Sequence, residues 1–276
     1  MISLRKNRLT FIQMLVSLYI NRRLIFDLTK REVLGRYTGS VIGVSWSFIN
    51  PLLMLAVYTF FFSVVFQAKW GINTSQNKAD FAIILFVGLI VHALFAECIN
   101  RAPSLVTNNV NYVKKIIFPL EILPCVAMGV ALFHAVVSLF ILLVIQLLFS
   151  GSISWTLVFF PFILFPLILT TLGISWILAA LGVYLRDIGQ ITAFITAILL
   201  FVSPVFYPLS MVPPKLQTVI LLNPLTLIIE QSRKVLLFGE IPDWDRLISY
   251  TIFSVLIAWV GFWCFQKTRR GFADVL

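Results

Sequence analysis

The chain has 276 residues, of which 60% are hydrophobic and only 12% are charged. A soluble domain carries about 25% charged residues, so this composition excludes an ordinary soluble protein. The formal net charge is +10, but the lysines and arginines lie between apolar runs rather than along one soluble face. This arrangement indicates phospholipid head groups, and not nucleic acid, as their counter-charge.

The first part of the chain is amphipathic. Within residues 9–28, Phe11, Leu15, Leu18 and Tyr19 fall on one side of a helix, and the polar residues fall largely elsewhere. Such a pattern predicts a helix that lies along the membrane surface. A frayed cytoplasmic tail is the alternative.

Six apolar runs follow, and a helix needs about 20 such residues to cross a bilayer core of about 30 Å. The sequence therefore predicts an all-α polytopic membrane protein with six transmembrane helices. We expect the spans at about residues 43–66, 81–98, 122–149, 157–183, 191–206 and 247–265. Prolines interrupt the stretch between the fifth and sixth spans, which predicts two short re-entrant or surface helices there.

The positive charges predict the orientation, because lysine and arginine are retained preferentially on the cytoplasmic side. With the N-terminus inside, 15 of the 21 lysines and arginines fall in inner segments. We expect both termini in the cytoplasm. The expected organisation is a cytoplasmic N-terminal segment with the surface helix (1–42), a six-span permease domain (43–265) and a basic cytoplasmic tail (266–276).

Residues that could carry chemistry are scarce. The chain has no phosphate-binding loop of the form G-x-x-x-x-G-K-[ST], and the span centres contain almost no ionisable side chains, which an ion-driven carrier would need. Glu97 and Arg101 are interpreted as the return of the second span to water. His92 and His134 each stand in an apolar helix without a nearby carboxylate and are interpreted as packed core residues. No catalytic residue and no metal site is predicted.

Aromatic residues recur at helical spacing. Tyr58, Phe62 and Phe66 share one side of the first span at i, i+4 and i+8, and Phe194 and Phe201 share one side of the fifth. Ring faces offer sugars broad apolar contact with few directional hydrogen bonds, so these residues are candidates for the lining of a sugar-chain passage. The same spacing is also typical of a packing face.

Four local patterns occur in order along nearly the whole chain. They are K-R-E-V-L-G-R-Y-T-G-S-V-I-G-V-S-W at 30–46 with Pro51, K-K-I-I-F-P-L-E-I-L-P at 114–124, Arg186-Asp187 followed by S-P-V-F-Y-P at 203–208, and Asn223-Pro224 with Glu230 and Arg233. Together they resemble the membrane subunit of type-2 ABC exporters for bacterial surface polysaccharides, the O-antigen, capsule and teichoic-acid permeases. The family commonly has Arg-Asp where this chain has Lys30-Arg31-Glu32, so the pairing of the acidic residue stays open.

The resemblance implies a homodimeric permease with two copies of a separate ABC ATPase docked underneath. ATP and Mg would be bound by that ATPase, and this chain would bind no cofactor of its own. The implied cargo is a lipid-linked polysaccharide, with O-antigen favoured, and the implied location is the bacterial inner membrane.

Within that scheme, three groups of site residues are expected. The ATPase contact would be made by Asn108, Asn109, Asn111, Tyr112, Lys114, Lys115, Arg186 and Asp187. Arg31, Arg36 and Tyr37 would gather lipid head groups, or the pyrophosphate of the carrier, at the entrance. Tyr207 joins the aromatic candidates, at the exit.

Three rival functions stay open from the sequence. An exporter of the same fold could carry drugs or other lipids. An ion-coupled carrier would stop when ion gradients collapse, whereas an ATP-driven one would stop when ATP is depleted. A membrane scaffold that transports nothing would leave surface polysaccharide unchanged when it is deleted.

Overall fold

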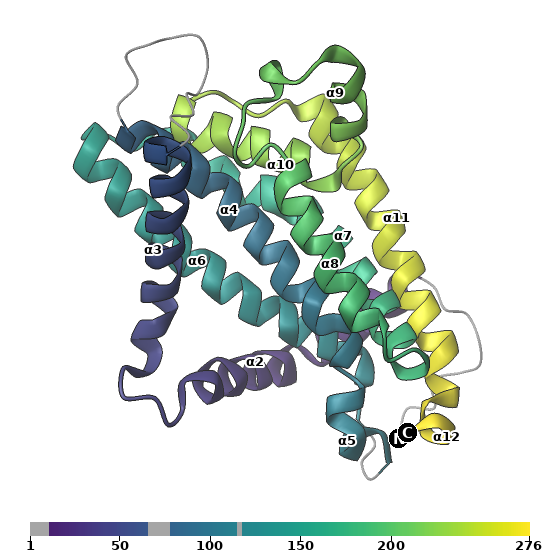
Figure 1. Ribbon diagram of the computed structural model, residues 1–276. Coiled ribbons are helices and arrows are strands. Elements are labelled where there is room, and N and C mark those ends of the chain that lie inside the picture. Colours follow the sequence, from purple (N-terminus) through teal and green to yellow (C-terminus); the bar gives the residue numbers. More distant parts are fainter. Residues whose placement is uncertain (1–10, 66–77, 115–117) are drawn as a thin grey trace.

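The computed structural model describes residues 11–65, 78–114 and 118–276. These ranges form a bundle of helices (Figure 1), and they contain no strand. The predicted all-α fold is confirmed.

Five helices in the described ranges are long and apolar enough to cross a membrane. They contain α3 (Trp46–Thr59), α4 (Lys78–Arg101), α6 (Leu123–Ser150), α7 (Phe160–Tyr184) and α11 (Trp244–Thr268). The first of them runs over Gly43–Phe62, because helical turns of other types extend α3 at both ends. They lie at the predicted first, second, third, fourth and sixth spans. The fifth predicted span begins within α8 (Ile188–Val202), which has 15 residues. At 1.5 Å per residue this helix is about 22 Å long, shorter than a bilayer core of about 30 Å, so a sixth crossing stays a prediction.

Short helices occupy both ends of the bundle. α9 (Pro214–Leu221) and α10 (Pro224–Arg233) lie at one end, as the prolines predict. The Asn223 side chain caps α10 by accepting a hydrogen bond from the backbone N–H of Leu225 at 3.0 Å. The opposite end carries α2 (Arg22–Tyr37) and α5 (Val110–Lys114) (Figure 1). We call these the α10 end and the α2 end.

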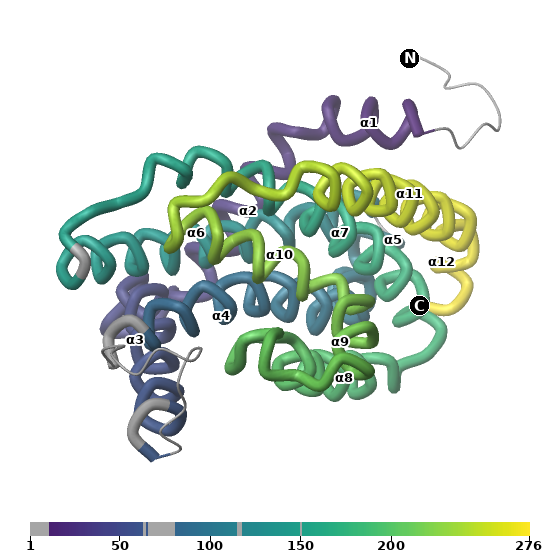
Figure 2. Tube along the Cα trace, turned by 90° about the horizontal axis from the view of Figure 1, so that it is seen from above, coloured from purple at the N-terminus to yellow at the C-terminus, as the bar shows by residue number. Residues whose placement is uncertain are grey.

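The predicted surface segment is two helices. α1 (Phe11–Ile20) and α2 meet at Asn21, and α1 lies along the outside of the bundle beside α11 (Figure 2). Met14 is buried, whereas Ile12 and Tyr19 are two-thirds exposed, at 66% and 67%. Apolar side chains on the outer side of α1 suit a helix that lies on a membrane surface.

Among the described residues, α7 and α11 form the most extensive contact between two helices. A Cβ atom added at Gly261 of α11 would lie 2.7 Å from the carbonyl carbon of Gly173 on α7, and one added at Gly173 would lie 2.6 Å from the carbonyl oxygen of Ile257. Both are closer than real Cβ contacts. The two backbones therefore touch because both positions are glycine, which is a typical way for helices to associate in lipid.

Gly261→Ala should lower the free energy of unfolding by about 1–3 kcal/mol, the usual cost of overpacking. The added methyl group has to push α11 away from α7. Gly189→Ala on α8 is the matched control, because nothing lies within 4 Å of a Cβ there. Thermal unfolding of both variants in detergent measures the difference, and equal melting temperatures would contradict the close contact.

A buried arginine connects the α10 end to the rest of the bundle. Arg233 at the end of α10 is 1% exposed. Its guanidinium donates to the carbonyl oxygen of Ile84 on α4 at 3.2 Å, and to those of Pro204 at 2.6 Å and Val205 at 2.9 Å, in the segment after α8. It also pairs with Glu230 at 3.1 Å. Arg233 thereby joins three segments that are far apart in sequence.

Candidate functional site

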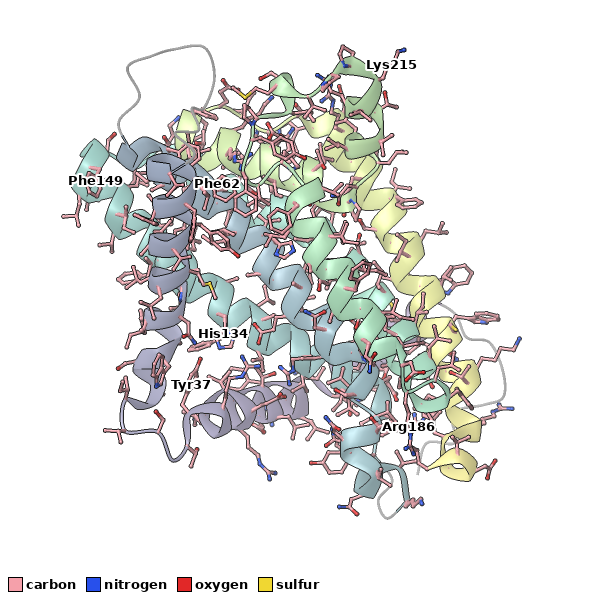
Figure 3. All side chains as sticks on the ribbon, in the orientation of Figure 1. Tyr37, Phe62, His134, Phe149, Arg186 and Lys215 are labelled. Carbon is pink, nitrogen blue, oxygen red and sulfur yellow. The ribbon has the colours of Figure 1, made fainter. Side chains whose placement is uncertain are left out.

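Four polar side chains from three helices meet near the α2 end. Glu97 on α4 accepts from Arg36 of α2 at 2.7 Å and contacts His134 Nδ1 of α6 at 2.8 Å. Tyr37 Oη lies 3.0 Å from His134 Nε2. Figure 3 shows Tyr37 and His134 close together between α2 and α6. We call Arg36, Tyr37, Glu97 and His134 the polar cluster.

The protonation of Tyr37 follows from its surroundings. Burial raises the pKa of the Tyr37 hydroxyl, and the neighbouring Arg36 opposes this shift. The hydroxyl is therefore protonated at physiological pH and can share a hydrogen bond with His134 Nε2. Because Glu97 lies at Nδ1, the imidazole has a partner at each of its two nitrogens.

One interpretation of the sequence is wrong here. His134 has a carboxylate nearby, because Glu97 of the adjacent helix reaches it. The side chain of Glu97 is 19% exposed and pairs within the bundle. Sequence reasoning missed the cluster because Arg36 and His134 are each tens of residues from Glu97 along the chain. His92 is buried and bonds to the carbonyl oxygen of Thr196 at 2.9 Å, as expected of a packed core histidine.

A second ion pair, between Arg101 and Glu32, joins α4 to α2. Arg101 therefore has a protein partner as well as access to water. The sequence left the partner of Glu32 open, and in the structure that partner is Arg101.

A cavity of about 550 Å³ opens beside these ion pairs. Its lining combines residues predicted for the entrance with residues predicted for the ATPase contact. The polar ones are Arg31, Glu32, Arg36, Arg101, Ser104, Asn108, Asn109 and Tyr112. The lining carries three guanidinium groups, of which Arg36 and Arg101 are ion-paired with Glu97 and Glu32. Arg31 adds a further positive charge, which favours an anionic ligand. We call this the head-group cavity.

The remaining predicted contact residues lie at the same end of the molecule. Asn111 and Lys114 are exposed on α5, whereas Lys115 lies outside the described residues. Arg186 and Asp187 are exposed in the turn between α7 and α8, and Figure 3 places Arg186 at the α2 end, far from Lys215. Two separate connections therefore present polar side chains to the same side.

Part of the predicted aromatic lining comes together near the α10 end. Phe206, which was not selected from the sequence, is the centre of this group. Phe62 stacks on it with ring centroids 4.3 Å apart, Tyr58 lies at 5.3 Å, and Phe201 at 5.6 Å. The S-P-V-F-Y-P motif contained Phe206, but the helical spacing used to choose candidates does not extend past the end of α8.

Among the described residues, Phe194 and Tyr207 are aromatic candidates outside this group. Phe194 is 68% exposed on α8. Tyr207 donates to the carbonyl oxygen of Val202 at 2.7 Å, and Phe66 lies outside the described residues.

Glu97→Gln should lower the free energy of unfolding by about 2 kcal/mol, because a hydrogen bond to a charged group contributes about 1.5–3 kcal/mol and the amide oxygen of glutamine replaces the carboxylate for only one of Arg36 and His134. Chemical denaturation in detergent gives the value. Glu240→Gln removes a carboxylate that is 60% exposed and 4.0 Å from Lys234, and it should change stability little. Equal losses in the two variants would show that the polar cluster is not structural.

Comparison with known proteins identifies the chain. The model of the ABC-2 type transporter family matches residues 23–237. An O-antigen export system permease protein, RfbA, of Myxococcus xanthus is 29% identical over 95% of this chain and 99% of its own length. An RfbA protein of Klebsiella pneumoniae is 24% identical over 95% and 100%. The polysialic acid transport protein KpsM of Escherichia coli is 22% identical over 87% and 91%. With a match over most of its length and five apolar helices of spanning length, the chain belongs to the ABC-2 type transporter family, as a membrane-embedded transport subunit rather than a catalytic one.

Proposed function

We propose that the chain is the permease of an ATP-driven exporter that moves a lipid-linked polysaccharide of the O-antigen class out of the cytoplasm across the inner membrane. The observation that carries this proposal is the full-length similarity to permeases whose names specify O-antigen export, at 99% and 100% of their own lengths. The head-group cavity supports it, since a positive lining suits the diphosphate or phosphate of a lipid carrier.

The energy source would be a separate ABC ATPase, since permeases of this family work with an ATPase partner. Two copies would dock at the α2 end, against α5 and the turn at Arg186 and Asp187, and they would hold the ATP and Mg. Exposed polar side chains on both connections support this docking. The α2 end and both termini would then face the cytoplasm.

The sixth crossing would be completed by α8 together with the segment after it. Ser203 to Phe206 continue from the end of α8 and are buried. α10 and α9 would then lie on the outer side, with Tyr207 near the exit.

A second copy of the chain would complete the passage. α3 and α8 lie on the same side of the bundle (Figure 2), and both carry exposed apolar side chains. On α3 these include Leu53 and Met54, and on α8 Phe194 and Ile198. A two-fold axis on this side would cover these faces and bring both aromatic groups around Phe206 to a central conduit.

Deletion of the gene tests the function directly. We expect lipid-linked glycan to accumulate in the cytoplasm and surface glycan to disappear, with both effects reversed by the wild-type gene. An unchanged distribution of glycan would refute export. Transport that survives ATP depletion but stops when ion gradients collapse would refute the ATP-driven class.

Arg31→Gln tests the head-group cavity. We expect export to slow by roughly tenfold at matched protein levels, equivalent to about 1.4 kcal/mol, because a charge-assisted contact to phosphate is lost. Surface glycan labelled on intact cells over time measures the rate. Arg23→Gln is the control, since Arg23 is exposed on the same helix but does not line the cavity. Equal rates for the two variants would remove Arg31 from the entrance.

A further inference from the structure

The C-terminal tail, residues 269–276, contacts both connections that are proposed to meet the ATPase. Its helix α12 (Phe272–Val275) packs against α5 and α7, next to α5 in Figure 1. Phe272 is fully buried. Tyr184 ends α7 just before Arg186, donates to the carbonyl oxygen of Thr268 at 3.2 Å, and has its ring centroid 6.1 Å from that of Phe272. The tail is thus part of the packed structure at the α2 end.

Arg269 joins this tail to the connection that contains α5. Its Nη1 lies 2.7 Å from Glu121 Oε2, and its Nη2 donates to the carbonyl oxygen of Phe118 at 2.8 Å. The Phe118 ring stacks on Tyr112 of α5, with centroids 4.3 Å apart. Because a guanidinium is planar, two bonds from its two nitrogens hold its direction as well as its distance. A continuous path therefore leads from α5 through Phe118 to Arg269.

Glu121 extends this path into the transmembrane helices. It lies in the turn that begins α6, and its side chain is only 9% exposed. Its second carboxylate oxygen accepts from Ser17 of α1 at 3.0 Å. Its backbone carbonyl accepts from the indole N–H of Trp176 on α7 at 2.9 Å. One residue thus connects α1, α6, α7 and the C-terminal tail.

We propose that the C-terminal tail is part of the coupling surface, and that Arg269 and Glu121 are positioning residues that make the two ATPase-facing connections move as one body. This inference rests on the proposed function, because it needs an ATPase seated on both connections. One connection joins α4 to α6 and the other joins α7 to α8. Without a link between them, a force that the ATPase applies to one connection would displace that connection alone and would not reach all the helices above it.

Arg269→Met tests this link, because it keeps the apolar stem and removes both bonds. The chain and its ATPase are produced together, and three quantities are measured: ATPase bound per permease, ATP hydrolysis by the purified complex, and glycan exported to the cell surface. We expect ATPase binding and hydrolysis to stay within about twofold of wild type, while export per ATP hydrolysed falls at least fivefold. A defect of structure alone would lower all three together.

Lys267→Met is the matched control. It removes the same charge two residues earlier, from a side chain whose ammonium lies 4.8 Å from the Trp263 ring centroid. We expect wild-type export per ATP. The proposal is overturned if Arg269→Met and Lys267→Met export the same amount of glycan per ATP hydrolysed. It is also overturned if export by Arg269→Met falls only in proportion to the ATPase that the variant binds.

If Arg269→Met does not accumulate in the membrane, milder variants test the link between Arg269 and Glu121. Arg269→Lys and Glu121→Gln can each keep one hydrogen bond of the pair, so the fold should tolerate them. Lower export per ATP in both supports the link, and wild-type ratios in both overturn it. A failure of the proposed function is distinguishable, because then the wild-type complex itself shows no ATP-dependent export.

Discussion

Helices in hydrocarbon gain little by hiding apolar side chains from one another, because lipid is as apolar as leucine. The bundle therefore depends on close backbone contact and on polar groups that satisfy one another. Gly173 and Gly261 provide the first, by letting α7 and α11 touch. Arg233 provides the second, because its guanidinium meets carbonyl groups of α4 and of the segment after α8. A buried guanidinium without such partners would cost several kcal/mol.

In the part of the chain that the structure describes, the ion pairs between helices lie toward the two ends of the bundle. Arg233 connects the helices at the α10 end, and the polar cluster connects α2, α4 and α6 near the α2 end. Glu121 and Arg269 form a further connection there, between α6 and the C-terminal tail. Between the ends, small and apolar residues pack together with neutral hydrogen bonds, such as that of His92 with the carbonyl oxygen of Thr196. The charged contacts at the ends hold the helices in register.

The position of the ion pairs at the ends of the bundle affects how a displacement caused by a docked ATPase would be transmitted to the helices. The head-group cavity is lined by α2 and by the segment that leads to α5, so a bound anion and a docked ATPase would act on neighbouring backbone. Charged contacts keep their partners at short, directional distances, whereas apolar packing permits sliding. The ion pairs near the α2 end are therefore the contacts best suited to carry displacement into the spans.

Composition and the spacing of apolar runs were enough to predict an all-helical membrane protein and the places of five of its long helices, because a bilayer demands about 20 apolar residues per crossing. Prolines predicted the short helices α9 and α10. The ordered motifs were enough for the family. The polar cluster and the role of Phe206 depended on tertiary structure, since Arg36, Glu97 and His134 meet only when three helices pack. A linear pattern reports which face of one helix is apolar, but not which face of another helix lies against it. For that reason, the partners of Glu97, Glu121 and Arg269 were decided only by the folded chain.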